Sequence, residues 1–285
     1  MQPDEVIVVG REGDAATEGA VRVLQPEGEG SAVLRWAAVN SPGHIPPVEA
    51  GVRMAAGEVV AVVDDDVTVS REWLGEILRP FRNPAVGVVG GRVVVPGQKV
   101  GRLKGRPGHV TWYGKTWGNV ARLEGEGVLE VDTVMEGNWA WRRELLTSLP
   151  MDPVLNFDDA SMYGLDLCLR AKASGFAVVY VPRALVLHHA GPRTPELDRA
   201  DRPARAFSFC RNYTYIMMKH LPWWRRVVFL AWWFGIGESA ACGVAAAVHR
   251  ALSGRGLRFR EAERVFAGKI EGIRLWLRGG ARSGL

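Results

Sequence analysis

Residues 58–66 read EVVAVVDDD, an apolar and β-branched run that ends in three adjacent carboxylates. A short run of this kind predicts a buried strand over residues 59–63. Open α/β sheets place their ligand crevice at the carboxyl ends of their strands, and the three carboxylates stand at that end. We therefore expect an α/β fold with a ligand site at Asp64, Asp65 and Asp66.

The spacing of the three carboxylates favours a divalent cation. Adjacent carboxylates repel one another unless a cation or hydrogen bonds offset their charge. In an extended segment Asp64 and Asp66 point the same way and Asp65 points the opposite way. Oxygen ligands of this kind suit a hard ion, so we expect Mg²⁺ or Mn²⁺. The alternative interpretation is a solvated acidic turn that caps the next helix.

Expected strands and helices alternate along the first two thirds of the chain. Strands are expected at residues 5–9, 21–24, 59–63, 86–95, 131–135, 177–181 and 184–187, the last two split by Pro182. Helices are expected at 48–56, after an N-cap at Ser70, at 142–149 and at 166–174. This alternation predicts an α/β class with a mixed, largely parallel sheet flanked by helices.

Composition narrows the classes of partner. The 285-residue chain has a net charge of +5 and a pI of about 9.3, which fits phosphate-bearing ligands or an anionic membrane surface. No basic stripe is interleaved with base-stacking aromatics, so we expect no nucleic acid partner. Three widely spaced cysteines and the lack of a signal-peptide pattern predict a cytoplasmic protein with buried thiols.

The chain changes character after residue 191. We expect a first domain over residues 1–191, a Pro- and Arg-rich linker over 192–205, and a helical region over 206–285. Residues 227–248 are almost wholly apolar and follow two tryptophans and two arginines, a pattern typical of a membrane interface. Peripheral association with the inner face of the cell membrane is therefore expected. A spanning or re-entrant segment, and two packed helices broken near residues 235–237, are the alternatives.

Several short motifs follow one another in an order that is more specific than any one of them. They are AAGE at 55–58, VVDDD at 62–66, WL at 73–74, VGVVGG at 86–91, EGN at 136–138 with RR at 142–143, LDLCLR at 165–170, GF at 175–176, YVP at 180–182 and LH at 187–188. Together they resemble the inverting family 2 glycosyltransferases, which have the GT-A fold. The resemblance extends from about residue 5 to residue 189.

The resemblance implies an enzyme that moves a sugar from a nucleotide-sugar donor to a hydroxyl acceptor. Asp64 and Asp66 match the DxD motif of the family and, with His188, are expected to hold Mg²⁺ or Mn²⁺ on the donor diphosphate. Gly137 and Asn138 match a loop that approaches the transferred sugar, and Asp65 is a further donor contact. The acceptor is expected to belong to cell-envelope, glycolipid or polysaccharide synthesis, because the C-terminal region suits a membrane surface.

Two departures from the family pattern affect the expected site. The family carries Glu-Asp where this chain has Tyr163-Gly164, so Asp166 is the predicted general base, with Asp158 and Asp159 as alternatives.

The second departure is at the start of the chain. Members of the family open with a strand and a Pro-Thr turn that binds the nucleotide base, and this sequence has no recognisable counterpart. Asp14 is the candidate for an acidic donor contact. These departures leave open a catalytically degenerate sugar-nucleotide-binding protein. The string Asp64-x-Asp66-x-Thr68 also leaves open a haloacid-dehalogenase-like phosphatase with Asp64 as nucleophile.

Overall fold

The computed structural model describes residues 1–24, 32–97, 106–118, 120–158, 162–189, 202–238, 241–252 and 259–280. The chain divides into two compact units, each of which is described by itself. The α/β unit comprises Met1–His109, Trp117–Met151 and Leu167–Gly191. The helical unit comprises Val110–Thr116, Asp152–Asp166 and Pro192–Leu285.

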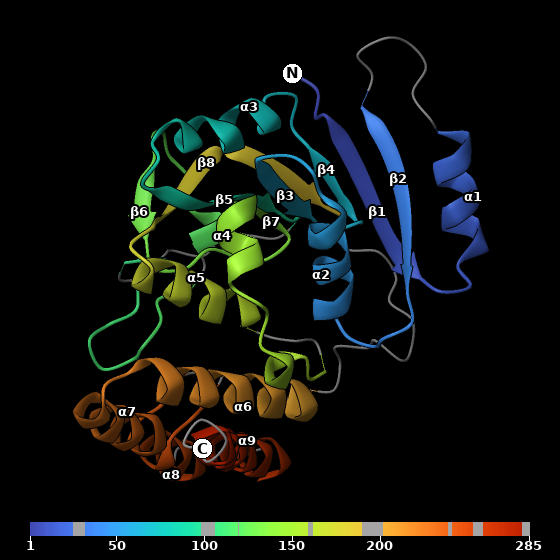
Figure 1. The fold of residues 1–285 in the computed structure, drawn as a ribbon. Helices are drawn as coiled ribbons and strands as arrows, with labels where there is room; N and C mark the ends of the chain where they lie inside the picture. Colours follow the sequence, from blue (N-terminus) through green and yellow to red (C-terminus); the bar gives the residue numbers. More distant parts are fainter. Residues whose placement is uncertain are drawn as a thin grey trace. The chain divides into compact units, whose positions relative to one another are not determined.

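The strands of the α/β unit form a two-stranded and a six-stranded sheet (Figure 1). They are β1 (Glu5–Arg11), β2 (Val33–Val39), β3 (Val59–Val63), β4 (Val67–Val69), β5 (Val86–Val94), β6 (Leu129–Val131), β7 (Asn138–Arg142) and β8 (Ala177–His188). The larger sheet has the order β3-β7-β5-β8-β4, with β6 paired to β8, while β1 pairs with β2.

The mixed α/β class is confirmed, but the sheet is not largely parallel. Among the described strands, only the β1–β2 and β5–β8 pairs are parallel, and the other pairs are antiparallel. The strand β7 causes much of this difference, because it runs antiparallel to both of its neighbours, β3 and β5. Apolar runs predict that a strand exists and is buried, but they carry no information on its direction.

The helices beside these strands are short. They are α1 (Ala15–Val23), α2 (Ile45–Met54), α3 (Trp73–Leu78), α4 (Arg143–Ser148) and α5 (Tyr163–Ala173), with the 3₁₀ helices η1 (Arg79–Arg82), η2 (Val120–Arg122) and η3 (Pro153–Leu155). Residues 21–24, expected as a strand, are the end of α1 and its C-cap, since a four-residue apolar run fits either structure. Helix α3 begins at Trp73 without a side-chain cap, so Ser70 is not its N-cap. The strand expected at 131–135 ends at Val131.

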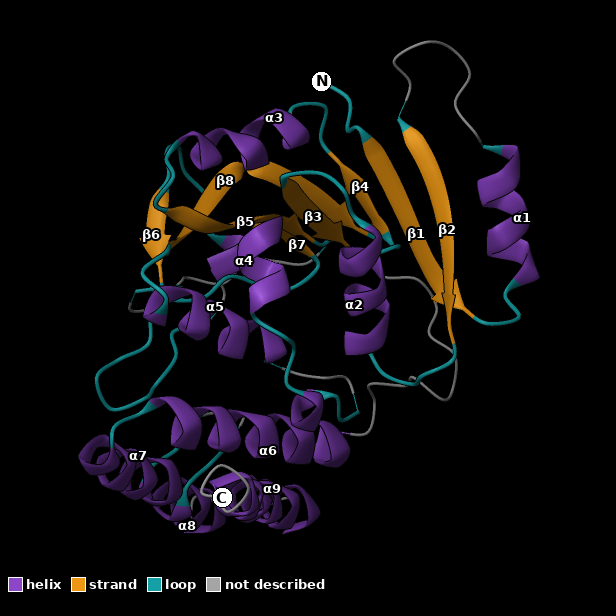
Figure 2. Ribbon diagram, viewed as in Figure 1, coloured by secondary structure: helices purple, strands orange, loops and turns teal. Residues whose placement is uncertain are grey.

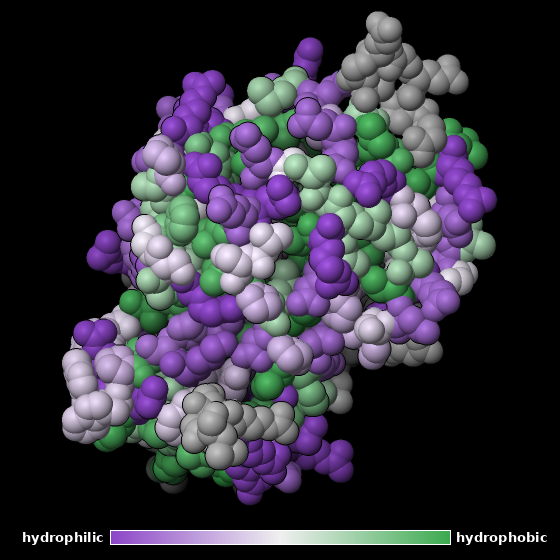
Figure 3. All heavy atoms as spheres, in the orientation of Figure 1, coloured by the Kyte–Doolittle hydropathy of each residue, from purple (hydrophilic) through white to green (hydrophobic). Residues whose placement is uncertain are grey.

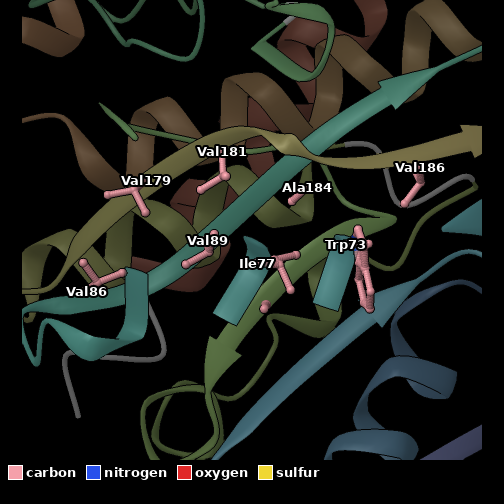
Figure 4. Packing of buried hydrophobic residues seen from close by; sticks show 9 residues of the cluster. Trp73, Ile77, Val86, Val89, Val179, Val181, Ala184 and Val186 are labelled. Carbon is pink, nitrogen blue, oxygen red and sulfur yellow. The ribbon is translucent and has the colours of Figure 1, made fainter. Parts of the chain in front are cut away.

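A hydrophobic core lies between the sheet and α3. Val89, Ala140 and Val181, from three neighbouring strands, are buried against Trp73 and Ile77 of α3 (Figure 4). Alternate residues of a strand point to opposite faces, so the neighbours of Ala140 in β7 face the other way. These are Trp139 and Trp141, whose rings are fully buried and meet edge to face at a centroid distance of 5.2 Å. The tryptophans of β7 therefore belong to the core.

The strand β8 is continuous through Pro182, where the sequence predicts a break. Its pairing with β5 shifts there: Val181 lies opposite Gly91, whereas the next partner, Arg92, lies opposite Leu185. Pro182 thus falls in a bulge, where a strand tolerates the missing N–H of proline. The bulge sets the register of the last residues of β8, up to His188.

The helical unit contains α6 (Arg202–His220), α7 (Trp223–Gly235), α8 (Val244–Leu252) and α9 (Phe259–Gly280), all visible in Figure 2. Helix α6 begins inside the stretch expected to be a linker, and residues 192–201 lie outside the described part. Helices α6 and α9 pack closely where α9 has glycine, since a Cβ at Gly268 would lie 2.5 Å from the Phe207 carbonyl oxygen.

The apolar segment 227–248 is not one helix. Helix α7 ends at Gly235, and α8 begins at Val244. The buried ammonium of Lys269 donates hydrogen bonds to the carbonyl oxygens of Trp233, Ala241 and Cys242 and thereby ties the end of α7 to the segment before α8. Within the described residues, no helix combines the length and the apolar character that crossing a bilayer requires.

Candidate metal and donor site

The structure brings the three predicted metal ligands together. Asp64, Asp66 and His188 each offer a ligand atom, and these atoms all lie within 4.8 Å of one another. The acidic triplet forms the turn between β3 and β4, and His188 is the last residue of β8. Because β4 and β8 are antiparallel with Val67 opposite His188, the imidazole lies beside the triplet.

Backbone and side-chain contacts hold the cluster in place. The Asp64 amide donates to the Gly137 carbonyl at 3.3 Å, and the His189 amide donates to the Asp66 carbonyl at 2.7 Å. His188 Nε2 lies 3.2 Å from Asp66 Oδ1. The other ring nitrogen, His188 Nδ1, is buried and has no hydrogen-bond partner among the described residues.

The charges of the cluster favour a bound cation. The pKa of Asp64 is raised, first by loss of solvent around its carboxyl group and then by the adjacent charge of Asp66. The nearby His188 partly offsets this rise. A divalent ion relieves repulsion between carboxylates, and two carboxylate oxygens with an imidazole nitrogen form a donor set that accepts Mn²⁺. The residues therefore fit the divalent cation that the sequence predicts.

Gly137 is essential to the shape of this cluster. Its φ of 87° lies in the left-handed region, which glycine adopts without strain. A Cβ atom built there would lie 2.3 Å from Asp64 Oδ2, well inside van der Waals contact. Only glycine therefore leaves room for the Asp64 carboxylate, and the predicted place of Gly137 beside the site is consistent with this geometry.

Asn138 is a structural residue, although the sequence predicts a donor contact. Its side chain is fully buried, and Oδ1 accepts a hydrogen bond from Trp73 Nε1 at 2.8 Å. Nδ2 donates to the carbonyl oxygens of Arg92 and Ala184, at 2.9 and 3.0 Å. Both Nδ2 protons are used, so the amide group pins the β8 bulge instead of facing a ligand. A motif match locates the residue but not the direction of its side chain.

The remaining predicted donor contacts lie in different surroundings. Asp65 is exposed between its two neighbours, as expected for a side chain that points away from theirs. Asp14 is the N-cap of α1, and its carboxylate accepts hydrogen bonds from the amide and the hydroxyl of Thr17. These bonds lower the pKa of Asp14. Its local task is thus to start a helix, which the polar loop in the sequence does not reveal.

The predicted base, Asp166, is enclosed within the helical unit. Its side chain is fully buried, and Oδ1 lies 2.8 Å from His220 Nε2 and 2.9 Å from Lys219 Nζ. Lys219 also bonds to Asp152, which in turn accepts a hydrogen bond from Tyr215. This network gives Asp166 a structural role. The spacing of motifs could not predict this network, because Lys219 and His220 lie far from Asp166 along the chain.

Of the two alternative bases, Asp158 lies within the described residues. Asp158 is exposed, has a φ of 54° and accepts a hydrogen bond from the Ser208 hydroxyl at 2.6 Å. Asp159 lies outside the described residues. Sequence reasoning also passed over His44, at the start of α2, whose charge contributes to lowering the pKa of Asp64. No motif marks that histidine.

Comparison with known proteins identifies the family to which this chain belongs. The sequence model of the family described as "Glycosyl transferase family 2" matches residues 1–147. The chain belongs to glycosyl transferase family 2. It is also 28% identical over 181 residues to "Uncharacterized protein y4gI" of Sinorhizobium fredii (strain NBRC 101917 / NGR234), a match that covers 59% of this chain and 19% of that protein. The chain thus spans about a fifth of the length of that relative.

Solved structures show that the fold is that of the GT-A glycosyltransferases. GalNAc-T7 with UDP, GalNAc and Mn²⁺ matches 75% of this chain and 41% of its own, with a TM-score of 0.56 and 15% identity. The match to the mannosyltransferase PcManGT from Pyrobaculum calidifontis, in complex with GDP-Man and Mn²⁺, covers 95% of this chain and 79% of that protein, with a TM-score of 0.54 and 17% identity. The match to TarS 1–349 of S. aureus, in complex with UDP-GlcNAc, covers 98% of this chain and 83% of that protein, with a TM-score of 0.54 and 14% identity.

Proposed function

We propose that this chain is a metal-dependent inverting glycosyltransferase that moves a sugar from a nucleotide-sugar donor to a hydroxyl acceptor. The main support for this proposal is the cluster of Asp64, Asp66 and His188 in a member of glycosyl transferase family 2. Two structures of the same fold contain Mn²⁺ together with UDP or GDP-Man. The phosphatase alternative has no comparable support, because the family match includes the acidic triplet itself.

The residues of the cluster divide the work of holding the donor. Asp64, Asp66 and His188 would hold Mg²⁺ or Mn²⁺, which supplies positive charge against the departing nucleoside diphosphate. Gly137 keeps the Asp64 carboxylate free of steric contact, and Asp65 remains open to the donor sugar or ribose. The chain thus contributes a preformed anionic cradle, in which the repulsion between carboxylates favours metal uptake.

An inverting transfer also needs a base that takes the proton from the acceptor hydroxyl. A base must reach that hydroxyl, and Asp166 is fully buried and held by Lys219 and His220. Asp158 is the exposed carboxylate among the predicted alternatives that the structure describes. Two variants test the predicted bases separately. Loss of kcat by at least 100-fold in a folded Asp158→Asn protein would support Asp158 as the base. The Asp166→Asn variant should lose stability, and the same loss of kcat in a stable Asp166→Asn protein would support Asp166 instead.

A donor screen by thermal shift tests the proposal. Purified protein is heated with UDP- and GDP-sugars, with and without Mn²⁺, and transfer to candidate lipid-linked and glycan acceptors of the cell envelope is measured. We expect Mn²⁺-dependent stabilisation by one class of donor, and its loss in Asp66→Ala with an unchanged circular dichroism spectrum. The matched control is Glu58→Ala, an exposed carboxylate just before β3. Normal Mn²⁺-dependent transfer by Asp66→Ala would refute the metal assignment.

A second candidate is a protein that binds the sugar nucleotide without turning it over. Tyr163-Gly164 replaces the expected acidic pair, and the nearest carboxylate in that motif, Asp166, is buried. The two candidates separate cleanly in one assay. Mn²⁺-dependent donor binding without transfer or donor hydrolysis supports the binding protein, whereas release of the nucleoside diphosphate supports the enzyme.

A further inference from the structure

Helix α7 is apolar on both of its sides. Its inner side carries Phe229 and Trp233, which are fully buried in the helical unit. Its outer side carries Trp223 and Val227, one helical turn apart and 75% and 63% exposed, with Trp224 beside them at 45%. The inner side is therefore well packed, and the exposure of the outer side is not a result of loose packing.

The exposed apolar surface extends beyond α7. Ile236, which follows the helix, is 61% exposed, and Val248 of α8 is 51% exposed. Trp112, from the short hairpin in which Val110 pairs with Thr116, is 56% exposed, and its ring stacks on Trp224 at a centroid distance of 6.4 Å. We call Trp112, Trp223, Trp224 and Val227 the outer apolar face.

A soluble surface rarely exposes tryptophan and aliphatic side chains together in this way, and such a face marks a site of interaction. In Figure 3, pale and green atoms lie over α7 and α8, consistent with the exposed side chains. Tryptophan has an amphipathic ring that favours the headgroup level of a bilayer. The composition of the face therefore fits a lipid interface.

Positive charge accompanies the outer apolar face. Arg225 and Arg226 follow directly on the two tryptophans, and within the described residues neither forms an ion pair with a carboxylate. The Arg225 guanidinium lies 4.9 Å from the ring centroid of Trp224. Residues 202–285 hold 15 Lys and Arg against 4 Asp and Glu, a net charge of +11, whereas residues 1–201 have a net charge of −6.

We propose that the outer apolar face binds an anionic lipid bilayer, with its tryptophans in the headgroup region and Arg225 and Arg226 on lipid phosphates. Basic side chains near a membrane surface add binding free energy, and apolar burial adds to it. A second copy of the chain is a poorer occupant, because a symmetric contact through this face would bring the arginines of both copies together. This inference goes beyond the proposed function, since it requires neither donor nor turnover.

Co-sedimentation of the full chain with lipid vesicles tests the inference. Vesicles of neutral phosphatidylcholine are compared with vesicles that also contain phosphatidylglycerol. We expect the wild type to bind the anionic vesicles at low salt and to bind neutral vesicles at least tenfold more weakly. The double variant Trp223→Ser/Val227→Ser should lower the partition coefficient on anionic vesicles at least tenfold. The variant Arg225→Gln/Arg226→Gln should lose the preference for anionic lipid.

The matched control is Val23→Ser, since Val23 is equally apolar and 84% exposed but lies in the α/β unit. It should bind vesicles like the wild type, and circular dichroism confirms that each variant is folded. Absence of wild-type binding to anionic vesicles overturns the inference. So does a wild-type dimer that becomes monomeric in Trp223→Ser/Val227→Ser without any vesicle binding. A failure of donor binding leaves this result unaffected, so the two proposals are tested separately.

Discussion

Replacing Asn138 by leucine separates a structural role from a donor contact. The two side chains have similar volumes, so Asn138→Leu removes hydrogen bonds without opening a large cavity. Three bonds are lost, to Trp73 Nε1 and to the carbonyl oxygens of Arg92 and Ala184. An unsatisfied buried polar group costs about 1–3 kcal/mol, so three of them should lower the free energy of unfolding by about 3 kcal/mol or more.

The effect is measured by urea unfolding of the full chain, followed by far-UV circular dichroism. With a typical dependence of about 1–3 kcal/mol per molar urea, the midpoint should fall by about 1 M or more. Asn40→Leu, at an exposed position, should change the free energy of unfolding by less than about 0.5 kcal/mol.

The same variant should weaken Mn²⁺ binding, because Asn138 pins the bulge that sets the register of His188. A change of less than about 1 kcal/mol, together with a donor KM raised tenfold at unchanged kcat, would refute this reasoning. It would show that the amide group faces the donor in solution.

Three further predictions concern other parts of the chain. Gly137→Ala should abolish Mn²⁺-dependent thermal stabilisation because its methyl group displaces Asp64, whereas Gly175→Ala, with a similar φ of 88° and no atom near its Cβ, should cost only about 1–2 kcal/mol of backbone strain. Burial lowers the pKa of Lys269 to about 8, below its unfolded value, so the unfolded chain binds more protons between about pH 8 and 10.5. Stability should therefore rise with pH across that window, and Lys269→Met should lack this rise in urea unfolding. Burial raises the pKa of the Cys168 thiol to about 12, so iodoacetamide at pH 8 should alkylate Cys168 only after unfolding, as mass spectrometry of the folded and unfolded protein can check.

The sequence predicts the parts of this protein that depend on local pattern. The β-branched run before Asp64 specifies β3, and the alternation of its carboxylates predicts that Asp64 and Asp66 share a ligand. The match at His188 predicts a third ligand, although it lies far along the chain, because the ordered motifs reflect one fold. The strand is confirmed because a few neighbouring residues determine it. The three predicted ligands lie together, and their binding of a metal stays a prediction.

Other features depend on contacts that no local pattern encodes. Asn138 turns inward because the irregular pairing of β5 and β8 presents two carbonyl groups to it, that of Arg92 in β5 and that of Ala184 in β8. Asp166 is enclosed because Lys219 and His220 meet it within the helical unit. The apolar segment 227–248 is long enough to cross a bilayer as one helix. In the structure it is interrupted, and the buried ammonium of Lys269 holds the two sides of the interruption together. In each case a distant partner decides the outcome.

The position of β8 in the sheet determines which fragments of this protein can exist on their own. This strand pairs with β4, β5 and β6, and it supplies His188. A polypeptide that stops at residue 147, where the family match ends, would keep both acidic ligands yet lose the strand on which three others depend. Such a product should emerge from the ribosome with open strand edges and aggregate, so the shortest soluble version must continue past residue 188.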